Sequence, residues 1–153
     1  MILREGVFNE MRSDQIVVGD ILFIREGELF PADLILLASS SPDGVAFIQT
    51  SSLDGEKNLK KRSRPKDIEK YILNSPLPDR MIFVGECVSE NPTAELYTYT
   101  GKIVICEDTF ALNANQLLLK GATLKNTEWI VGFTVFTGND TKLMMNSQKV
   151  RNK

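Results

Sequence analysis

Asp54, Gly55 and Glu56 form the stretch of this sequence with the clearest capacity for chemistry. Glycine adopts backbone angles that are closed to other residues and lets a second chain approach closely. A carboxylate held on such a loop can orient a water molecule and accept its proton, so Glu56 is a candidate general base. A single carboxylate cannot supply the two-carboxylate pair of a glycosidase or the oxygen cage of a divalent cation. Glu56 would therefore need a partner that supplies the electrophile; the simpler alternative is that Asp-Gly marks only a turn.

The rest of the chain contains few other candidate catalytic or ligand-binding residues. No histidine is present, which removes the commonest general base, the usual metal ligand and every Ser-His or Cys-His pair. Cys87 and Cys106 form no Cys-x-x-Cys motif, and two cysteines without histidine argue against a zinc site. We interpret both as reduced core residues, with a disulfide as the alternative. The stretch from Lys120 to Thr123 is only superficially like a phosphate-binding loop, because the order is wrong and no upstream glycine has the required spacing.

A basic segment follows the candidate loop. Its members are Lys57, Lys60, Lys61, Arg62, Arg64 and Lys66. Such a segment is either a solvated face or a contact for an anion, such as a phosphorylated partner, acidic side chains or lipid head groups. No aromatic residue is interleaved to stack bases, and the net charge of −2 gives no argument for nucleic acid, so we expect no nucleic-acid partner.

The length and composition indicate one domain with a substantial core. The chain has 153 residues, of which 42% are hydrophobic. Its longest purely aliphatic run, Leu34 to Ala38, is far shorter than the roughly 20 residues that span a membrane. The first residues lack the apolar region of a signal peptide. We expect a soluble chain, or a soluble piece of something larger.

Most of the sequence predicts β structure. The predicted strands are Ile21–Ile24, Asp33–Ala38, Val45–Thr50, Met81–Val88, Ala94–Tyr99, Lys102–Cys106, Gln116–Leu119 and Trp129–Phe136. A short helix is predicted over Pro65–Asn74, and Asp140 is a candidate cap for a final helix over Thr141–Val150. Many short strands separated by turns favour a compact sandwich or barrel-like domain, in which the strand ending at Thr50 delivers the candidate loop.

The order of several motifs is more specific than any one of them. The series runs through Val18–Ile21, Phe30–Leu37, Ser39–Ser40, Thr50–Lys60, Glu90–Pro92, Leu96–Tyr97, Gly101, Leu118–Ile130, Phe136–Met144 and Asn146–Ser147. This series resembles the actuator domain of the class-four P-type ATPases, the phospholipid flippases, over nearly the whole chain. The resemblance implies a mainly β fold, a distorted jelly roll with a few short helices. It also implies that residues 1–153 are one actuator domain, a soluble fragment of a larger membrane ATPase.

The resemblance further implies a role for each loop residue. P-type ATPases phosphorylate an aspartate in a separate domain, and the actuator domain rotates to bring its loop against that aspartyl phosphate. Glu56 would then position and activate the hydrolytic water, Gly55 would allow the close approach, and Asp54 would shape the loop and contact the partner domain. Loop support and further interdomain contacts would come from Lys57, Asn58, Leu59 and Lys60. Lys57 stands where the family commonly has threonine; its charge would favour ionised Glu56 or pair with phosphate oxygens.

The implied partners are the phosphorylation and nucleotide-binding domains of the same polypeptide, membrane helices, a phospholipid substrate and an accessory membrane subunit. The domain itself would lie in the cytosol and bind no cofactor or metal, while ATP and Mg2+ would serve the full-length enzyme. This chain has no Asp-Lys-Thr-Gly phosphorylation motif, so alone it is expected to be inactive. Two other classes stay open: a stand-alone β-rich interaction domain whose basic segment docks an acidic or phosphorylated partner, and an independent hydrolase that uses Glu56.

Overall fold

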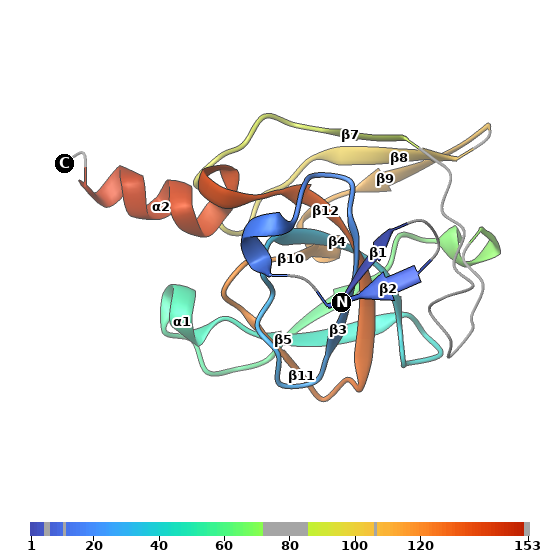
Figure 1. Cartoon of the computed structure of the whole chain (residues 1–153), viewed down its shortest axis with the longest axis horizontal. Coiled ribbons are helices and arrows are strands. Elements are labelled where there is room, and N and C mark those ends of the chain that lie inside the picture. Colours follow the sequence, from blue (N-terminus) through green and yellow to red (C-terminus); the bar gives the residue numbers. More distant parts are fainter. Residues whose placement is uncertain (5–6, 11, 72–85, 106, 152–153) are drawn as a thin grey trace.

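The computed structural model describes residues 1–4, 7–10, 12–71, 86–105 and 107–151. Three antiparallel sheets dominate this part of the chain (Figure 1). The largest has the strand order β10-β4-β12-β3-β1-β2. Its strands are β1 (Ile2–Arg4), β2 (Val7–Asn9), β3 (Ile21–Arg25), β4 (Asp33–Ser39), β10 (Leu117–Leu118) and β12 (Trp129–Phe136). The predicted mainly β fold is therefore confirmed.

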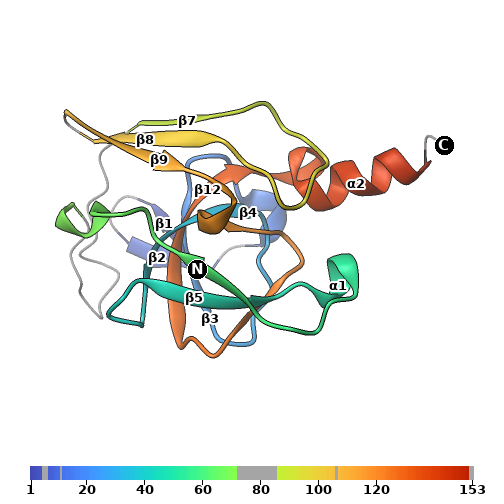
Figure 2. The ribbon, with the colours of Figure 1, turned by 180° about the vertical axis from the view of Figure 1, so that it is seen from behind.

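Two three-stranded sheets complete the β structure. One has the order β11-β5-β6 and contains β5 (Val45–Gln49), β6 (Lys60–Ser63) and β11 (Thr123–Lys125). The other has the order β7-β8-β9 and contains β7 (Glu86–Ser89), β8 (Gly101–Ile105) and β9 (Asp108–Leu112). Figures 1 and 2 show these two sheets on opposite sides of β4 and β12. All three sheets contribute buried side chains to one hydrophobic core.

The centre of that core is the pair β4 and β12. Every residue of β4 is buried, as its nearly continuous apolar sequence requires. Gly132 of β12 faces it closely, since a Cβ atom added there would lie 3.0 Å from the Cβ of Leu34. The register between the strands shifts at Val131 and Gly132. A glycine at this position lets the two strands approach where the register is irregular.

The helices are short. In the described residues they comprise α1 (Ser51–Asp54), α2 (Lys142–Arg151) and the 3-10 turns η1 (Ser13–Gln15), η2 (Ile68–Lys70), η4 (Ala114–Gln116) and η5 (Gly138–Asp140). Both α1 and α2 lie at the same end of the domain, and α2 projects away from its body (Figures 1 and 2). In the described ranges, no helix is both long and apolar enough to cross a membrane.

Several sequence-based boundaries agree with the structure. The strands predicted to begin at Ile21, Asp33, Val45 and Trp129 are β3, β4, β5 and β12, with ends shifted by at most one residue. The strand predicted from Lys102 is β8, and the one predicted from Gln116 shortens to β10. Of the strand predicted over residues 81–88, only the part within β7 falls on described residues. Trp129 is partly buried and stacks on Phe23 with ring centroids 5.8 Å apart.

Other predictions were wrong. Ala94–Tyr99 forms no strand, because the chain turns at Leu96 and Tyr97. Side chains of α2 bond to the chain just before that turn: Lys142 Nζ lies 3.4 Å from Thr93 O, and Asn146 Nδ2 donates to Ala94 O at 3.1 Å. The helix predicted from Pro65 shortens to η2 in the described residues; residues 72–74 lie outside them. The final helix is capped by Thr141 rather than Asp140, since the Met144 amide donates to the Thr141 hydroxyl.

Strands β1, β2, β6, β9 and β11 and helix α1 were not predicted. Alternating burial does mark β9, in which Phe110 and Leu112 point inward, but β6 is a basic segment with no apolar alternation. Cys87 is a half-buried free thiol, and burial raises its pKa. Cys106, which we also interpreted as a reduced core residue, lies outside the described residues.

Candidate functional site

A single helical turn delivers the candidate loop from strand β5. Helix α1 ends at Gly55, whose amide donates to the carbonyl of Ser51 at 2.9 Å and whose φ of 76° lies in the left-handed region. That conformation favours glycine at the end of a helix. A Cβ atom added at Gly55 would meet no described atom within 4 Å. The glycine is thus required by backbone conformation, and the space above it is open to an approaching group.

Asp54 is turned toward its own loop. The hydroxyl of Thr50 lies 3.1 Å from each Asp54 carboxylate oxygen, and the amide of Glu56 donates to Asp54 Oδ1 at 2.9 Å. Thr50 is fully buried and the Asp54 side chain is only 14% exposed. Short polar side chains of this kind fix local backbone conformation by bonding to nearby amides. Asp54 therefore holds the backbone that carries Glu56.

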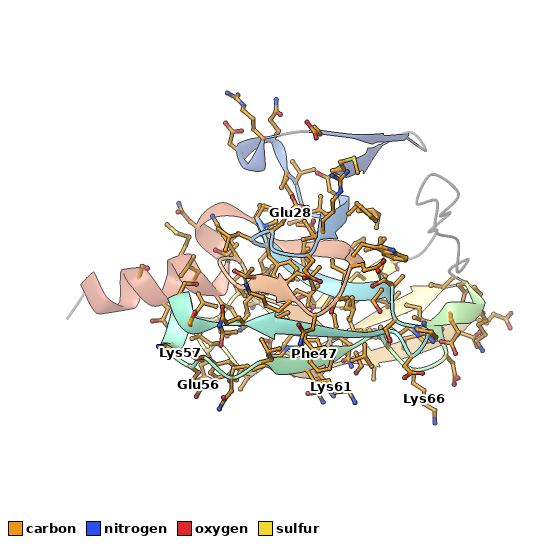
Figure 3. The ribbon with its side chains drawn as sticks, turned by 90° about the horizontal axis from the view of Figure 1, so that it is seen from below. Glu28, Phe47, Glu56, Lys57, Lys61 and Lys66 are labelled. Atoms are coloured by element: carbon orange, nitrogen blue, oxygen red, sulfur yellow. The ribbon has the colours of Figure 1, made fainter. Side chains whose placement is uncertain are left out.

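Glu56 is the exposed carboxylate of the loop, with 57% of its side chain accessible to solvent. Figure 3 shows Glu56 and Lys57 near α1, at the edge of the domain. The ammonium group of Lys60 pairs with Glu56 Oε2 and lies 3.9 Å from Asp54 Oδ2. The same ammonium lies 4.8 Å from the ring centroid of Tyr97, within the range of a cation–π interaction.

The remaining predicted loop residues line the same edge. Lys57, Asn58 and Leu59 are exposed. The carbonyl of Lys57 accepts from Gln49 Nε2 at 3.4 Å, so this residue is tied to β5 through its backbone. The Lys57 side chain itself is exposed. The structure thus brings all the predicted site residues together on one loop between β5 and β6.

Two contacts attach α1 to the rest of the domain. The hydroxyl of Ser52 donates to the carbonyl of Gly121 at 2.7 Å, and Leu53 packs against the core. A Cβ atom added at Gly121 would lie 3.2 Å from Leu143 Cδ2 and 3.5 Å from Leu53 Cδ2. Helix α1 has no buried residue of its own, so its position depends on these contacts with the turn at Gly121.

The family model of the P-type ATPase actuator domain matches residues 1–144. This chain belongs to that family. It is 42% identical over 140 residues to phospholipid-transporting ATPase DRS2 of Saccharomyces cerevisiae. The matched region covers 92% of this chain and 10% of the relative. Phospholipid-transporting ATPase tat-1 of Caenorhabditis elegans is 42% identical, covering 97% of this chain and 13% of the relative. Phospholipid-transporting ATPase 10 of Arabidopsis thaliana is 39% identical, and the matched region covers 93% of this chain and 12% of the relative. The chain thus spans about a tenth of the length of these relatives.

The basic segment of this actuator domain does not form one free cationic surface. The guanidinium of Arg62 is buried and donates through Nε to Leu117 O at 2.9 Å, and burial lowers its pKa. Arg64 lies 3.5 Å from Glu69, and Lys60 is engaged with Glu56. The exposed lysines are spread along the domain edge, with Lys57 and Lys66 toward opposite ends (Figure 3). The alternative of a stand-alone interaction domain, which needs a continuous basic surface to bind its partner, is not favoured.

The turn at Lys120–Thr123 does not offer a phosphate-binding loop. The Lys120 amide donates to Asp33 Oδ1 at 2.9 Å, and the Gly121 amide donates to Phe30 O at 3.0 Å. The Ala122 amide donates to Leu119 O at 3.1 Å. These donors are satisfied within the fold, so the turn does not fit a nucleotide phosphate, and its rejection from sequence agrees with the structure.

Sequence reasoning missed the residues that hold the loop in place, namely Thr50, Ser52, Tyr97, Gly121 and Asp33. Of these, only Asp33 could have been recognised from the sequence, because a carboxylate at the start of a buried apolar run needs hydrogen-bond partners. Asp33 accepts from the amides of both Lys120 and Lys142, at 2.9 and 2.8 Å, and thereby joins the Gly121 turn to the start of α2. Burial raises the pKa of Asp33, and the two amide hydrogen bonds oppose that shift in part.

Proposed function

We propose that residues 1–153 act as the actuator domain of a longer, ATP-driven phospholipid-translocating membrane ATPase. In this proposal the Asp54-Gly55-Glu56 loop promotes hydrolysis of an aspartyl phosphate formed on another domain of the same polypeptide. Rotation of the actuator domain couples that hydrolysis to phospholipid movement. The family match and the similarity to phospholipid-transporting ATPases of yeast and Caenorhabditis elegans support the proposal. The observation that carries the catalytic part is the exposed Glu56 carboxylate on a loop whose neighbouring residues are anchored to the domain.

The chemistry requires only one base from this domain. Glu56 accepts a proton from a water molecule while the water oxygen attacks phosphorus. The bond between phosphorus and the aspartyl oxygen breaks, which releases inorganic phosphate and regenerates the aspartate. The open space above Gly55 leaves room for the phosphorylated loop to approach. Asp54, which bonds to Thr50 and to the Glu56 amide, keeps the base in place during that approach.

The other components of the cycle belong elsewhere in the proposed full-length protein. ATP and Mg2+ serve the nucleotide-binding and phosphorylation domains, and membrane helices carry the phospholipid path. The domain works on the cytosolic side, and an accessory membrane subunit is a further proposed partner. The amides of Lys120, Gly121 and Ala122 are bonded within the fold, which supports placing the ATP site outside this turn.

The direct test is Glu56→Gln in the full-length ATPase that carries this domain. The amide keeps the size of the side chain but cannot accept a proton from water, so the phosphoenzyme should form from labelled ATP and then persist after a chase with unlabelled ATP. Glu128→Gln is the matched control, because Glu128 is also exposed but follows β11. Wild-type decay of the phosphoenzyme in the Glu56→Gln protein would overturn the proposed catalytic role.

A further inference from the structure

Lys60 is placed where three groups converge. Its ammonium pairs with Glu56 Oε2, lies 3.9 Å from Asp54 Oδ2 and sits 4.8 Å from the ring centroid of Tyr97. The Lys60 side chain is 23% exposed, whereas that of Glu56 is 57% exposed. The cation is therefore the more enclosed member of the pair, and the carboxylate faces solvent.

This enclosure matters because a lysine side chain is otherwise flexible. Its ammonium is a point charge on a four-carbon stem, and an exposed ion pair of this kind contributes little to stability. The second carboxylate and the aromatic ring restrict where the ammonium can lie. Lys60 also begins strand β6, where its backbone pairs with Ile48 of β5, so its stem starts from a fixed point.

Tyr97 is itself held from a distant part of the chain. It belongs to the irregular segment between β7 and β8, whose Thr93 hydroxyl accepts from Lys142 Nζ at 3.0 Å. The neighbouring Ala94 carbonyl accepts from Asn146 Nδ2 at 3.1 Å. Helix α2 thus anchors the segment that carries the ring beneath Lys60.

We infer that Lys60 is a positioning residue for Glu56, an inference that rests on the proposed function. A carboxylate has two oxygens with about four lone-pair sites. Lys60 occupies Oε2, which orients the group and leaves Oε1 for the attacking water. Asp54 is less accessible to that water, since its side chain is 14% exposed, against 57% for Glu56, and accepts from Thr50 and the Glu56 amide. One loop therefore carries two carboxylates with separate tasks, and Lys60 contacts both.

The test compares phosphoenzyme decay in full-length Lys60→Met, Lys60→Arg, Glu56→Gln and Glu56→Gln/Lys60→Met proteins. We expect Lys60→Met to slow decay about 10- to 100-fold, the scale of a misplaced catalytic group. Lys60→Arg keeps the charge and should stay within about threefold of wild type. The double variant should decay no more slowly than Glu56→Gln, because a residue that acts only through Glu56 has nothing left to position. Lys61→Met, an exposed lysine on the same strand, is the matched control.

The outcomes separate this inference from the proposed function. Wild-type decay in Lys60→Met, together with slowed but measurable decay in Glu56→Gln, overturns only the role of Lys60. A double variant slower than Glu56→Gln also overturns it, since Lys60 would then act independently. Normal decay in Glu56→Gln overturns the proposed function itself. Tyr97→Ala provides a second route if Lys60→Met forms no phosphoenzyme: slowed decay that Tyr97→Phe does not share supports the inference, and unchanged decay overturns it.

Discussion

The hydroxyl of Ser52 donates a 2.7 Å hydrogen bond to the carbonyl of Gly121, which is 69 positions further along the chain. This bond joins the helical turn that delivers Glu56 to the turn that precedes β11. A Cβ atom added at Gly121 would lie within 3.5 Å of the side chains of both Leu53 and Leu143, so α1 and α2 meet at Gly121. The candidate base is consequently positioned by contacts distant in sequence as well as by its own loop.

Ser52→Ala should slow breakdown of the phosphoenzyme in the full-length protein by several-fold, because α1 loses its side-chain bond to the Gly121 turn. The free energy of unfolding of the isolated domain should fall by about 1 kcal/mol, the usual scale for one hydrogen bond. Decay after an ATP chase and urea unfolding measure the two effects. Ser51→Ala is the control, since no side-chain bond of Ser51 is present among the described residues. Equal decay in both variants would contradict the anchoring role.

Gly55→Ala should destabilise the isolated domain by about 1–2 kcal/mol, because alanine is strained in the left-handed conformation. The variant should also slow phosphoenzyme breakdown, since the added methyl group occupies the space through which the phosphorylated loop approaches. Gly27→Ala is a close control: Gly27 has a φ of 85°, and a Cβ atom there also meets no described atom within 4 Å. Similar destabilisation without slower breakdown is expected for Gly27→Ala. Slow breakdown in both variants would indicate backbone strain alone.

Asp33→Asn should destabilise the domain by about 1–3 kcal/mol, because asparagine offers one acceptor oxygen to the two amides that Asp33 now satisfies. The effect should depend on pH. Burial raises the pKa of Asp33 in the folded state above the ordinary value of an aspartate, so the folded state binds this proton more tightly. Stability from Asp33 is therefore greatest at low pH and declines as pH rises from about the unfolded pKa through the raised folded pKa.

The stability difference between wild type and Asp33→Asn should accordingly shrink as the pH increases across that window. Urea unfolding of both proteins at a series of pH values measures it. A difference that grows with pH would show that the hydrogen bonds to the carboxylate outweigh its burial.

Arg62→Met should destabilise the isolated domain by about 1–3 kcal/mol, because the Leu117 carbonyl loses its buried donor. Lys61→Met, one position earlier on the same strand but exposed, should change stability by less than about 0.5 kcal/mol. Urea unfolding distinguishes the two. Sedimentation with anionic vesicles provides a second measurement, in which Lys61→Met should bind as wild type does. A strong loss of vesicle binding in Lys61→Met would restore the anion-docking interpretation of the basic segment.

The strands that were predicted well from the sequence are those whose position depends on local hydrophobicity. Asp33–Ser39 and Trp129–Phe136 are apolar runs that can only be buried, so their positions follow from composition and length. Ala94–Tyr99 had a strand-like composition, but α2 side chains bond to carbonyls at and just before its start, and the segment stays irregular. Strand β6 was missed for the opposite reason: its basic residues join a sheet by pairing with β5, which no local pattern reveals.

The family, the mainly β class and the loop that carries Glu56 could be predicted from the chain alone, because they depend on local motifs and apolar runs in a distinctive order. The contacts around that loop could not: Arg62 is buried and bonds to Leu117, Ser52 donates to Gly121, and the Lys60 ammonium contacts Glu56 and Tyr97. The physical reason is that these contacts join residues from separate strands and turns. Whether a charged side chain is solvated, buried or paired depends on which segments fold against it, and that information is not local in the chain.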